Sequence, residues 1–155
     1  MAVRSAGILM YRGKEHDLQV LLVHPGGPFW RNKDLGAWSI PKGEYQPDED
    51  PEAAARREFT EELGVAPAGE LQPLGEIRQS GGKRVTAFAV AGNLDVGAVR
   101  SNAFEMEWPP RSGRMEKFPE VDRAAWFALP LAHKKILASQ RPLLERLTDL
   151  AARRS

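Results

Sequence analysis

The stretch from Gly43 to Val65 constrains the fold of this chain more than any other part of it. Asp50 is a good N-cap, and Pro51 suits the first helical position, where its missing N–H costs nothing. Gly64 stands where a helix favours a left-handed residue at its C-terminal end. The sequence therefore predicts a helix between Asp50 and Gly64, preceded by a loop that starts at a glycine.

The predicted helix carries three carboxylates on one side. Glu58, Glu61 and Glu62 are spaced i, i+3 and i+4, so their side chains emerge together. The like charges repel one another, and a divalent cation turns this repulsion into coordination. Oxygen-only ligation suits Mg²⁺, with Mn²⁺ as a substitute, and both ions are readily shared with substrate phosphates. We expect Ala54 and Ala55, one turn earlier, to leave room above the carboxylates.

An expected pair of an arginine and a glutamate supports this interpretation. Arg57 is expected to point away from the three carboxylates and to pair with Glu49, which pins the preceding loop against the helix. Such a pair would hold the metal ligands in position without binding the metal itself. The alternative is an acidic helix face that is simply exposed to solvent, which is what an isolated cluster of glutamates usually is.

The complete pattern resembles the signature of the Nudix hydrolases, G-x5-E-x7-R-E-U-x-E-E-x-G-U, where U is a bulky apolar residue. The matching positions are Gly43, Glu49, Arg57, Glu58, Phe59, Glu61, Glu62, Gly64 and Val65. The resemblance implies an enzyme that hydrolyses a nucleoside diphosphate linked to some other group X. It also implies an α+β fold, an α/β/α sandwich in which a mixed sheet lies between helices and the signature forms a loop-helix-loop.

The same resemblance implies roles for the carboxylates. In that family, the residues matching Glu58, Glu61 and Glu62 hold the metal ions, often with the carbonyl oxygen of the residue matching Gly43. The metal offsets the charge of the diphosphate and lowers the pKa of an attacking water molecule.

A carboxylate must then take the proton of that water molecule. Glu58 is our first choice, but some family members use a glutamate from a loop beyond the signature. Glu120 is the best candidate for this outside glutamate, with Glu105 and Glu107 as rivals. For each of the three, a solvated surface acid is the alternative.

The residues before the signature bear on the substrate. Trp38 to Gly43 reads W-S-I-P-K-G, which is similar to Nudix enzymes that cleave dinucleoside polyphosphates and to relatives acting on diphosphoinositols or capped RNA. Lys42 can contact a polyphosphate as a point charge, although it can also be a solvated lysine. We expect Trp38 to be part of the core rather than a platform for a base.

Two further segments are candidates for substrate contacts. The range 109–119 is polar and basic, and we expect it to be a loop in which Arg111 and Arg114 close over the distal phosphates; a mobile, solvated loop is the alternative. The loop from Gly26 to Trp30 carries aromatic residues that could stack on a nucleobase. The isolated histidines, His16, His24 and His133, show no metal-binding spacing and are expected at the surface or satisfied in the core.

The overall composition limits the function classes. A length of 155 residues predicts one domain, residues 1–155. The net charge of +1 gives no general attraction to nucleic acid, and the absence of cysteine excludes thiolate nucleophiles and cysteine-bound zinc. No segment has the length of a membrane span, so we expect a cytoplasmic protein. We expect its substrate to be a small nucleotide. Whether the protein forms a homodimer is left open. The segments expected to form strands are 3–11, 18–24, 38–40, 74–79, 83–91, 102–108 and 124–127, with a C-terminal helix after Gln140.

Three rival functions remain open from the sequence. Two are enzymatic: a nucleoside triphosphate pyrophosphatase of the sanitising kind and an RNA 5′-end pyrophosphohydrolase. The third is a binding module that has kept the fold and lost catalysis. The complete set of Glu58, Glu61 and Glu62 speaks against this third class.

Overall fold

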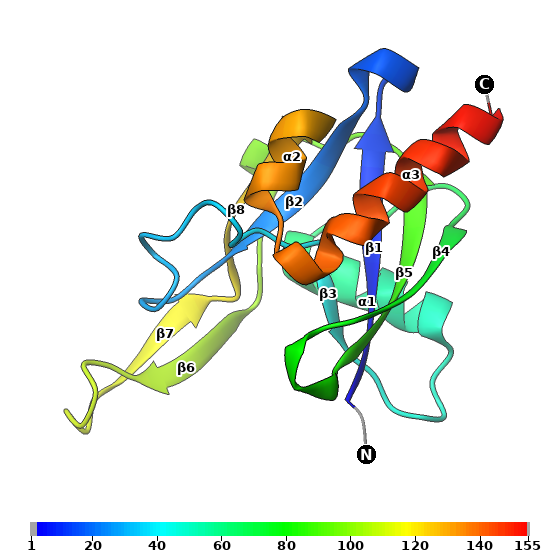
Figure 1. The fold of residues 1–155 in the computed structure, drawn as a ribbon. Coiled ribbons are helices and arrows are strands. Elements are labelled where there is room, and N and C mark those ends of the chain that lie inside the picture. The colour runs from blue at the N-terminus through cyan, green and yellow to red at the C-terminus, as the bar shows by residue number, and fades with distance from the viewer. Residues whose placement is uncertain (1–2, 155) are drawn as a thin grey trace.

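The computed structural model describes residues 3–154, which form a mixed six-stranded sheet with helices on both faces (Figure 1). The strand order is β4-β5-β1-β2-β8, and β3 also pairs with β1. Only the β1–β5 pair is parallel. The strands of this sheet are β1 (Arg4–Arg12), β2 (Gln19–Pro25), β3 (Lys42–Glu44), β4 (Gln72–Arg78), β5 (Arg84–Ala91) and β8 (Val121–Ala128).

The helices divide into two layers. The α-helices are α1 (Pro51–Leu63), α2 (Leu129–Lys135) and α3 (Arg141–Arg154). Short 3-10 turns are η1 (Glu15–Asp17), η2 (Ser80–Gly82), η3 (Val96–Ala98) and η4 (Ala138–Gln140). None of the helices within residues 3–154 has the length and apolar character that crossing a membrane requires.

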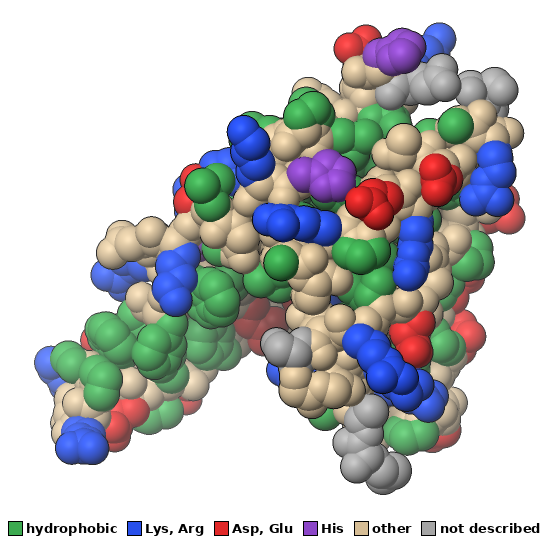
Figure 2. Space-filling model, viewed as in Figure 1, with side chains coloured by type: hydrophobic (Ala, Val, Ile, Leu, Met, Phe, Trp, Pro, Cys, Tyr) green, Lys and Arg blue, Asp and Glu red, His purple; other side chains and the backbone are tan. Residues whose placement is uncertain are grey.

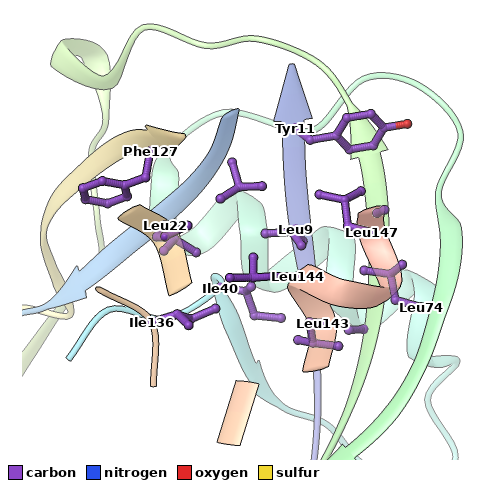
Figure 3. Close-up of a cluster of buried hydrophobic side chains, with 14 of the residues drawn as sticks. Leu9, Tyr11, Leu22, Ile40, Leu74, Phe127, Ile136, Leu143, Leu144 and Leu147 are labelled. Carbon is purple, nitrogen blue, oxygen red and sulfur yellow. The ribbon is translucent and has the colours of Figure 1, made fainter. Parts of the chain in front are cut away.

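Strand β1 shows why helices cover both faces of the sheet. Successive side chains of a strand point to opposite faces, and all of β1 from Ser5 to Tyr11 is buried. Leu9 and Tyr11 join a cluster that includes residues of α3 (Figure 3), whereas Ile8 and Met10 join the cluster on the α1 face. The predicted α/β/α sandwich is therefore confirmed.

Helix α1 begins and ends where the sequence predicts. The Asp50 side chain accepts a hydrogen bond from the Ala53 amide at 3.0 Å, and Gly64 closes the helix with a φ of 80°. The buried face consists of Ala54, Ala55, Phe59 and Leu63. The expectation that the two alanines leave room above the carboxylates is wrong, because their small side chains let α1 pack closely on the sheet.

A second, two-stranded sheet projects from the body of the protein (Figure 1). It consists of β6 (Ala103–Glu107) and β7 (Met115–Pro119), which pair in antiparallel register with Phe104 opposite Phe118. The prediction of a loop over residues 109–119 is therefore wrong for its second half. Charged residues on an exposed hairpin hide the alternation that normally marks a strand.

Two other details differ from the prediction. Residues 38–40 form isolated bridges, from Ser39 to Val23 and from Trp38 to Ile136, rather than a strand. Helix α2 was not predicted from the sequence. It has no side-chain N-cap and covers only seven residues, so local signals are weak.

Candidate active site

Close packing of Glu58 against Gly43 joins helix α1 to strand β3. A Cβ atom added to Gly43 would lie 2.0 Å from Glu58 Oε2 and 2.1 Å from Cδ. The glycine is thus required by this contact rather than by an unusual φ angle.

The predicted pair of Arg57 and Glu49 is confirmed. The guanidinium donates from Nε and Nη2 to the two Glu49 oxygens, each at 3.0 Å, in the bidentate arrangement that orients both groups. Arg57 does not point away from the predicted metal ligands Glu58 and Glu61, however. Its Nη1 also donates to Glu58 Oε1 at 2.8 Å and lies 3.6 Å from Glu61 Oε1. Hydrogen bonding to Arg57 lowers the pKa of the Glu49 carboxyl.

Two carboxylates of α1 are poorly solvated. Burial, and then the charges of Glu58 and Glu120, raise the pKa of the Glu62 carboxyl to about 8. Burial and the charge of Glu61 raise the pKa of Glu58 as well, although Arg57 acts in the opposite direction. Both effects disfavour negative charge in the absence of a cation. The site therefore concentrates carboxylates that a bound cation would stabilise.

A cavity of about 220 Å³ borders Glu62 but not Glu58. It brings together Lys42 from β3, Glu62 from α1 and Glu120 from the junction of β7 and β8. Figure 2 shows acidic side chains in the hollow between the projecting hairpin and the body of the protein. The residues around the cavity are Val23, Pro25, Trp30, Ala37, Ser39, Ile40, Lys42, Glu62, Glu120, Val121 and Leu137.

Lys42 places a cation beside Glu62. Burial lowers the pKa of its ammonium group, and the charge of Glu62 opposes this shift. Lys42 also contributes to holding Glu62 ionised, through its charge and a backbone hydrogen bond. Both side chains border the cavity, where the Lys42 ammonium group offers a positive charge to an anionic ligand.

The structure distinguishes between the three candidates for a glutamate base beyond the signature. Glu120 borders the cavity, and its charge acts on both Glu58 and Glu62. Glu105 and Glu107 lie on β6 and do not border it. Glu107 instead accepts a hydrogen bond from the Arg111 amide at 2.7 Å. Only Glu120 among the three has the location that an outside base requires.

The other predicted contact residues lie farther out. Arg111 and Arg114 are exposed at the tip of the β6–β7 hairpin, which projects away from the body (Figure 1), and neither borders the cavity. Trp38 is 4% exposed and belongs to the core, as predicted. Phe29 is 63% exposed, whereas Trp30 is half-buried and borders the cavity.

Some cavity residues were missed by the sequence reasoning. Leu137 reaches the cavity from the connection between α2 and η4, and no local signal links it to the signature. Ser39 could have been found, because it lies three residues before Lys42. Its hydroxyl accepts a hydrogen bond from Gln140 Nε2 at 2.9 Å. A larger hollow, of about 550 Å³, borders Arg4, Tyr45 and Arg84, and it contains none of the site carboxylates.

Comparison with known families agrees with this geometry. Residues 1–147 match the family model described as the NUDIX domain. The chain belongs to the Nudix family. It is a Nudix hydrolase, of a family that acts on the pyrophosphate bonds of nucleoside diphosphate derivatives. No curated protein matches the chain in sequence.

Solved structures share the Nudix fold with this chain. The C. elegans Ap4A hydrolase binary complex has a TM-score of 0.65 and 23% identity, covering 96% of this chain and 98% of that chain. The NUDIX domain of Shewanella oneidensis NrtR, complexed with ADP ribose, has a TM-score of 0.67 and 18% identity, covering 97% and 88%. A mutT/nudix family protein from Listeria innocua has a TM-score of 0.64 and 18% identity, covering 98% and 95%.

Nudix enzymes generally use divalent metals, and the donor set of this Nudix hydrolase fits such an ion. Glu58 and Glu62 offer carboxylate oxygens in a poorly solvated place, which suits a hard cation. Within residues 3–154, no three acidic or histidine side chains are grouped as closely as metal ligands are. Arg57 instead supplies the positive charge beside Glu58. The ligand set of Glu58, Glu61, Glu62 and the Gly43 carbonyl oxygen remains a prediction.

Proposed function

We propose that this Nudix hydrolase is a divalent-metal-dependent pyrophosphohydrolase that cleaves a phosphoanhydride bond of a dinucleoside polyphosphate. The observation that carries the proposal is the cavity that brings Lys42, Glu62 and Glu120 together. A lysine beside half-buried carboxylates suits a ligand with several phosphates. The W-S-I-P-K-G sequence and the structural similarity to the C. elegans Ap4A hydrolase support the same substrate class.

Each residue has a distinct part in this proposal. Glu58, Glu61 and Glu62, with the Gly43 carbonyl oxygen, would hold Mg²⁺, or Mn²⁺ in its place. The bound ion would offset phosphate charge and acidify the attacking water molecule. Lys42 contacts the phosphate chain, and the pair of Arg57 and Glu49 holds the preceding loop against the helix.

The proton of the attacking water molecule passes to a carboxylate. Glu58 is the first candidate, since the raised pKa of its carboxyl brings it nearer to neutrality, where a general base works well. Glu120 is the second candidate, on the strength of its place at the cavity. Arg111 and Arg114 would contact distal phosphates only if the hairpin tip moved toward the cavity.

Aromatic side chains next to the cavity suit the nucleoside part of the substrate. Trp30 borders the cavity, and the exposed ring of Phe29 lies 5.9 Å from that of Trp108 in an edge-to-face arrangement. Aromatic faces stack on nucleobases with little preference for the base. These rings would therefore hold a base while its phosphates lie near Lys42.

A panel of nucleotides assayed with Mg²⁺ in oxygen-18 water tests the proposal. We expect dinucleoside polyphosphates to be hydrolysed faster than nucleoside triphosphates or 5′-triphosphorylated RNA, and the label to identify the phosphorus that is attacked. Faster cleavage of either rival substrate would assign the corresponding rival activity. The chain is proposed to act as one cytoplasmic domain, residues 1–155, and sedimentation would show whether it forms a homodimer.

The variant Glu61→Gln separates an enzyme from a binding module. An enzyme that needs this carboxylate for its metal should lose about 100-fold or more of its turnover, whereas a binding module should lose ligand affinity alone. Glu105→Gln, which removes a carboxylate from the hairpin, is the matched control and should behave as the wild type. Intact substrates and no uptake of Mg²⁺ or Mn²⁺ by the wild type would refute the proposed function.

A further inference from the structure

A fully buried histidine at the end of β2 lies between two hydrogen-bond acceptors. His24 has no exposed surface; its Nδ1 lies 2.8 Å from Asp122 Oδ1 and its Nε2 lies 2.6 Å from the Lys33 carbonyl oxygen. A carbonyl oxygen only accepts, so Nε2 carries a proton. An ionised carboxylate also only accepts. The contact at Nδ1 therefore needs one more proton, carried either by the ring or by the carboxyl group.

An irregularity in the sheet brings Asp122 to this ring. His24 pairs with Arg123 and Pro25 pairs with Val121, so Asp122 is the extra residue of a β-bulge. A bulge of this kind redirects a side chain and is common next to active sites. Without the bulge, the alternation of β8 would not offer a carboxylate to the His24 ring.

The remaining charges around the ring are paired with one another. The Trp38 ring meets His24 edge-on, with a centroid separation of 5.2 Å. Arg123 Nε lies 3.8 Å from Asp122 Oδ1, and its guanidinium lies over the Trp38 ring. Hydrogen bonds from Lys135 and Trp38 lower the pKa of Asp34. Asp122 therefore contacts the His24 ring directly, whereas Arg123 and Asp34 contact Asp122 and Trp38, and Lys135 pairs with Asp34.

The contacts of His24 join two walls of the catalytic cavity. Lys33 belongs to the segment 26–37, which carries Trp30 at one wall. Asp122 directly follows Glu120 and Val121, which form another wall. The Gly26 amide completes the connection by donating to the Glu120 carbonyl oxygen at 2.9 Å. Each contact of the ring therefore connects β2 to one wall, in addition to the backbone pairing of β2 with β8.

We propose that His24 is a positioning residue, which fixes Trp30 and Glu120 at the cavity by holding one proton between its Nδ1 and the Asp122 carboxylate. Without that proton, two acceptors would face each other at this contact. The inference deepens the proposed function, because it concerns the same cavity, and the hydrogen bonds on which it is built do not depend on the substrate.

The variant Asp122→Asn tests the shared proton. An asparagine amide can donate to Nδ1 of a neutral ring whose Nε2 still donates to Lys33, so both contacts survive without a titrating proton. Nitrogen-15 spectra of the His24 ring should show this neutral form in Asp122→Asn throughout the range from about pH 6 to about pH 10. In the wild type, the spectra should show a proton at the contact between Nδ1 and Asp122, and the Trp30 and Gly26 amide signals should match those of Asp122→Asn.

Steady-state kinetics provide a second readout. Asp122→Asn keeps both contacts, so its KM should stay near the wild-type value, whereas loss of the Nδ1 contact should raise KM at least about threefold, with kcat changed less. Asp95→Asn, a change of the same kind in the exposed turn before η3, is the matched control and should follow the wild type. Asp122→Ala has no group for Nδ1 and should raise KM at every pH.

Two outcomes would overturn the inference. One is a wild-type contact in which neither Nδ1 nor the Asp122 carboxyl group carries a proton; the other is a KM of Asp122→Ala equal to that of the wild type. If no nucleotide is hydrolysed at all, the proposed function fails, while the spectra still decide the role of His24. The conservative asparagine variant keeps the test independent of whether His24→Ala folds.

Discussion

At the scale of single residues, the site depends on a few contacts that tolerate no extra atom. Gly43 is the clearest case, since the Glu58 carboxylate occupies the space that any side chain at this position would need. The requirement is local and steric. It therefore separates Gly43 from glycines that are needed for a left-handed backbone, such as Gly64.

The variant Gly43→Ala should push the Glu58 carboxylate out of place. Because catalysis depends on ligand positions to within a fraction of an ångström, we expect kcat to fall about 100-fold, with a much smaller effect on the fold. Gly92→Ala is the control, since its nearest neighbour is the flexible end of Met10. Equal kinetics for Gly43→Ala and the wild type would contradict the steric argument.

The Glu62 carboxyl gives a pH dependence of stability in the metal-free protein. Its pKa is about 8 in the folded protein, against the ordinary glutamate value of 4.5 that applies to the unfolded chain. Between these values the folded chain binds a proton that the unfolded chain does not, so the free energy of unfolding falls as pH rises. Metal-free Glu62→Gln should therefore exceed the wild type in stability by on the order of 2 kcal/mol above pH 8, and by little at pH 5.

Urea unfolding of both proteins at several pH values would measure this difference. Glu105→Gln, which removes a carboxylate of the hairpin, is the control for the loss of one charge. A difference between wild type and Glu62→Gln that does not change with pH would mean that Glu62 titrates normally. Added Mg²⁺ should reverse the order of stability, because it favours the ionised carboxylate.

At the scale of elements, helix α1 is the part that the sequence predicts best. Its N-cap, its first-turn proline and its closing glycine are all local signals, and each lies where predicted. The strand β7 and the helix α2 could not be predicted in the same way. Their formation depends on pairing with β6 and packing against β2 and β8, which are contacts between distant parts of the chain.

The variant Asp50→Ala removes the N-cap of α1. The Ala53 amide would lose its acceptor, which typically costs about 1 kcal/mol of the free energy of unfolding. Chemical denaturation would measure this loss, with Asp48→Ala, in the same exposed loop, as the control. We expect metal affinity to fall less than stability, because the metal-site glutamates lie two turns further along α1.

At the scale of the whole molecule, the class of fold follows from the sequence, but the meeting of the site residues does not. Lys42, Glu62 and Glu120 come from three elements, and only the first two lie close to the signature in the sequence. The place of Glu120 depends on how β8 joins the far edge of the sheet. A pattern in one segment carries no information on such an arrangement, and for this reason the sequence leaves Glu105 and Glu107 as rivals to Glu120.

The variant Leu144→Ala tests how far the core is separate from the site. Leu144 is fully buried between α3 and the sheet, on the face opposite α1. Its truncation should lower the free energy of unfolding by about 3 kcal/mol, while kcat at a temperature where the protein is folded should stay within about twofold. Leu131→Ala, at a site that is 44% exposed, should cost much less.

The double role of Arg57 has a consequence for the loading of the proposed metal ion. Its guanidinium already offsets the negative charges of Glu49 and Glu58. Removal of the ion by a chelator should therefore leave helix α1 folded. Loading would then be reversible and would require no refolding. Ion availability could thus turn hydrolysis on and off in a molecule that stays folded throughout.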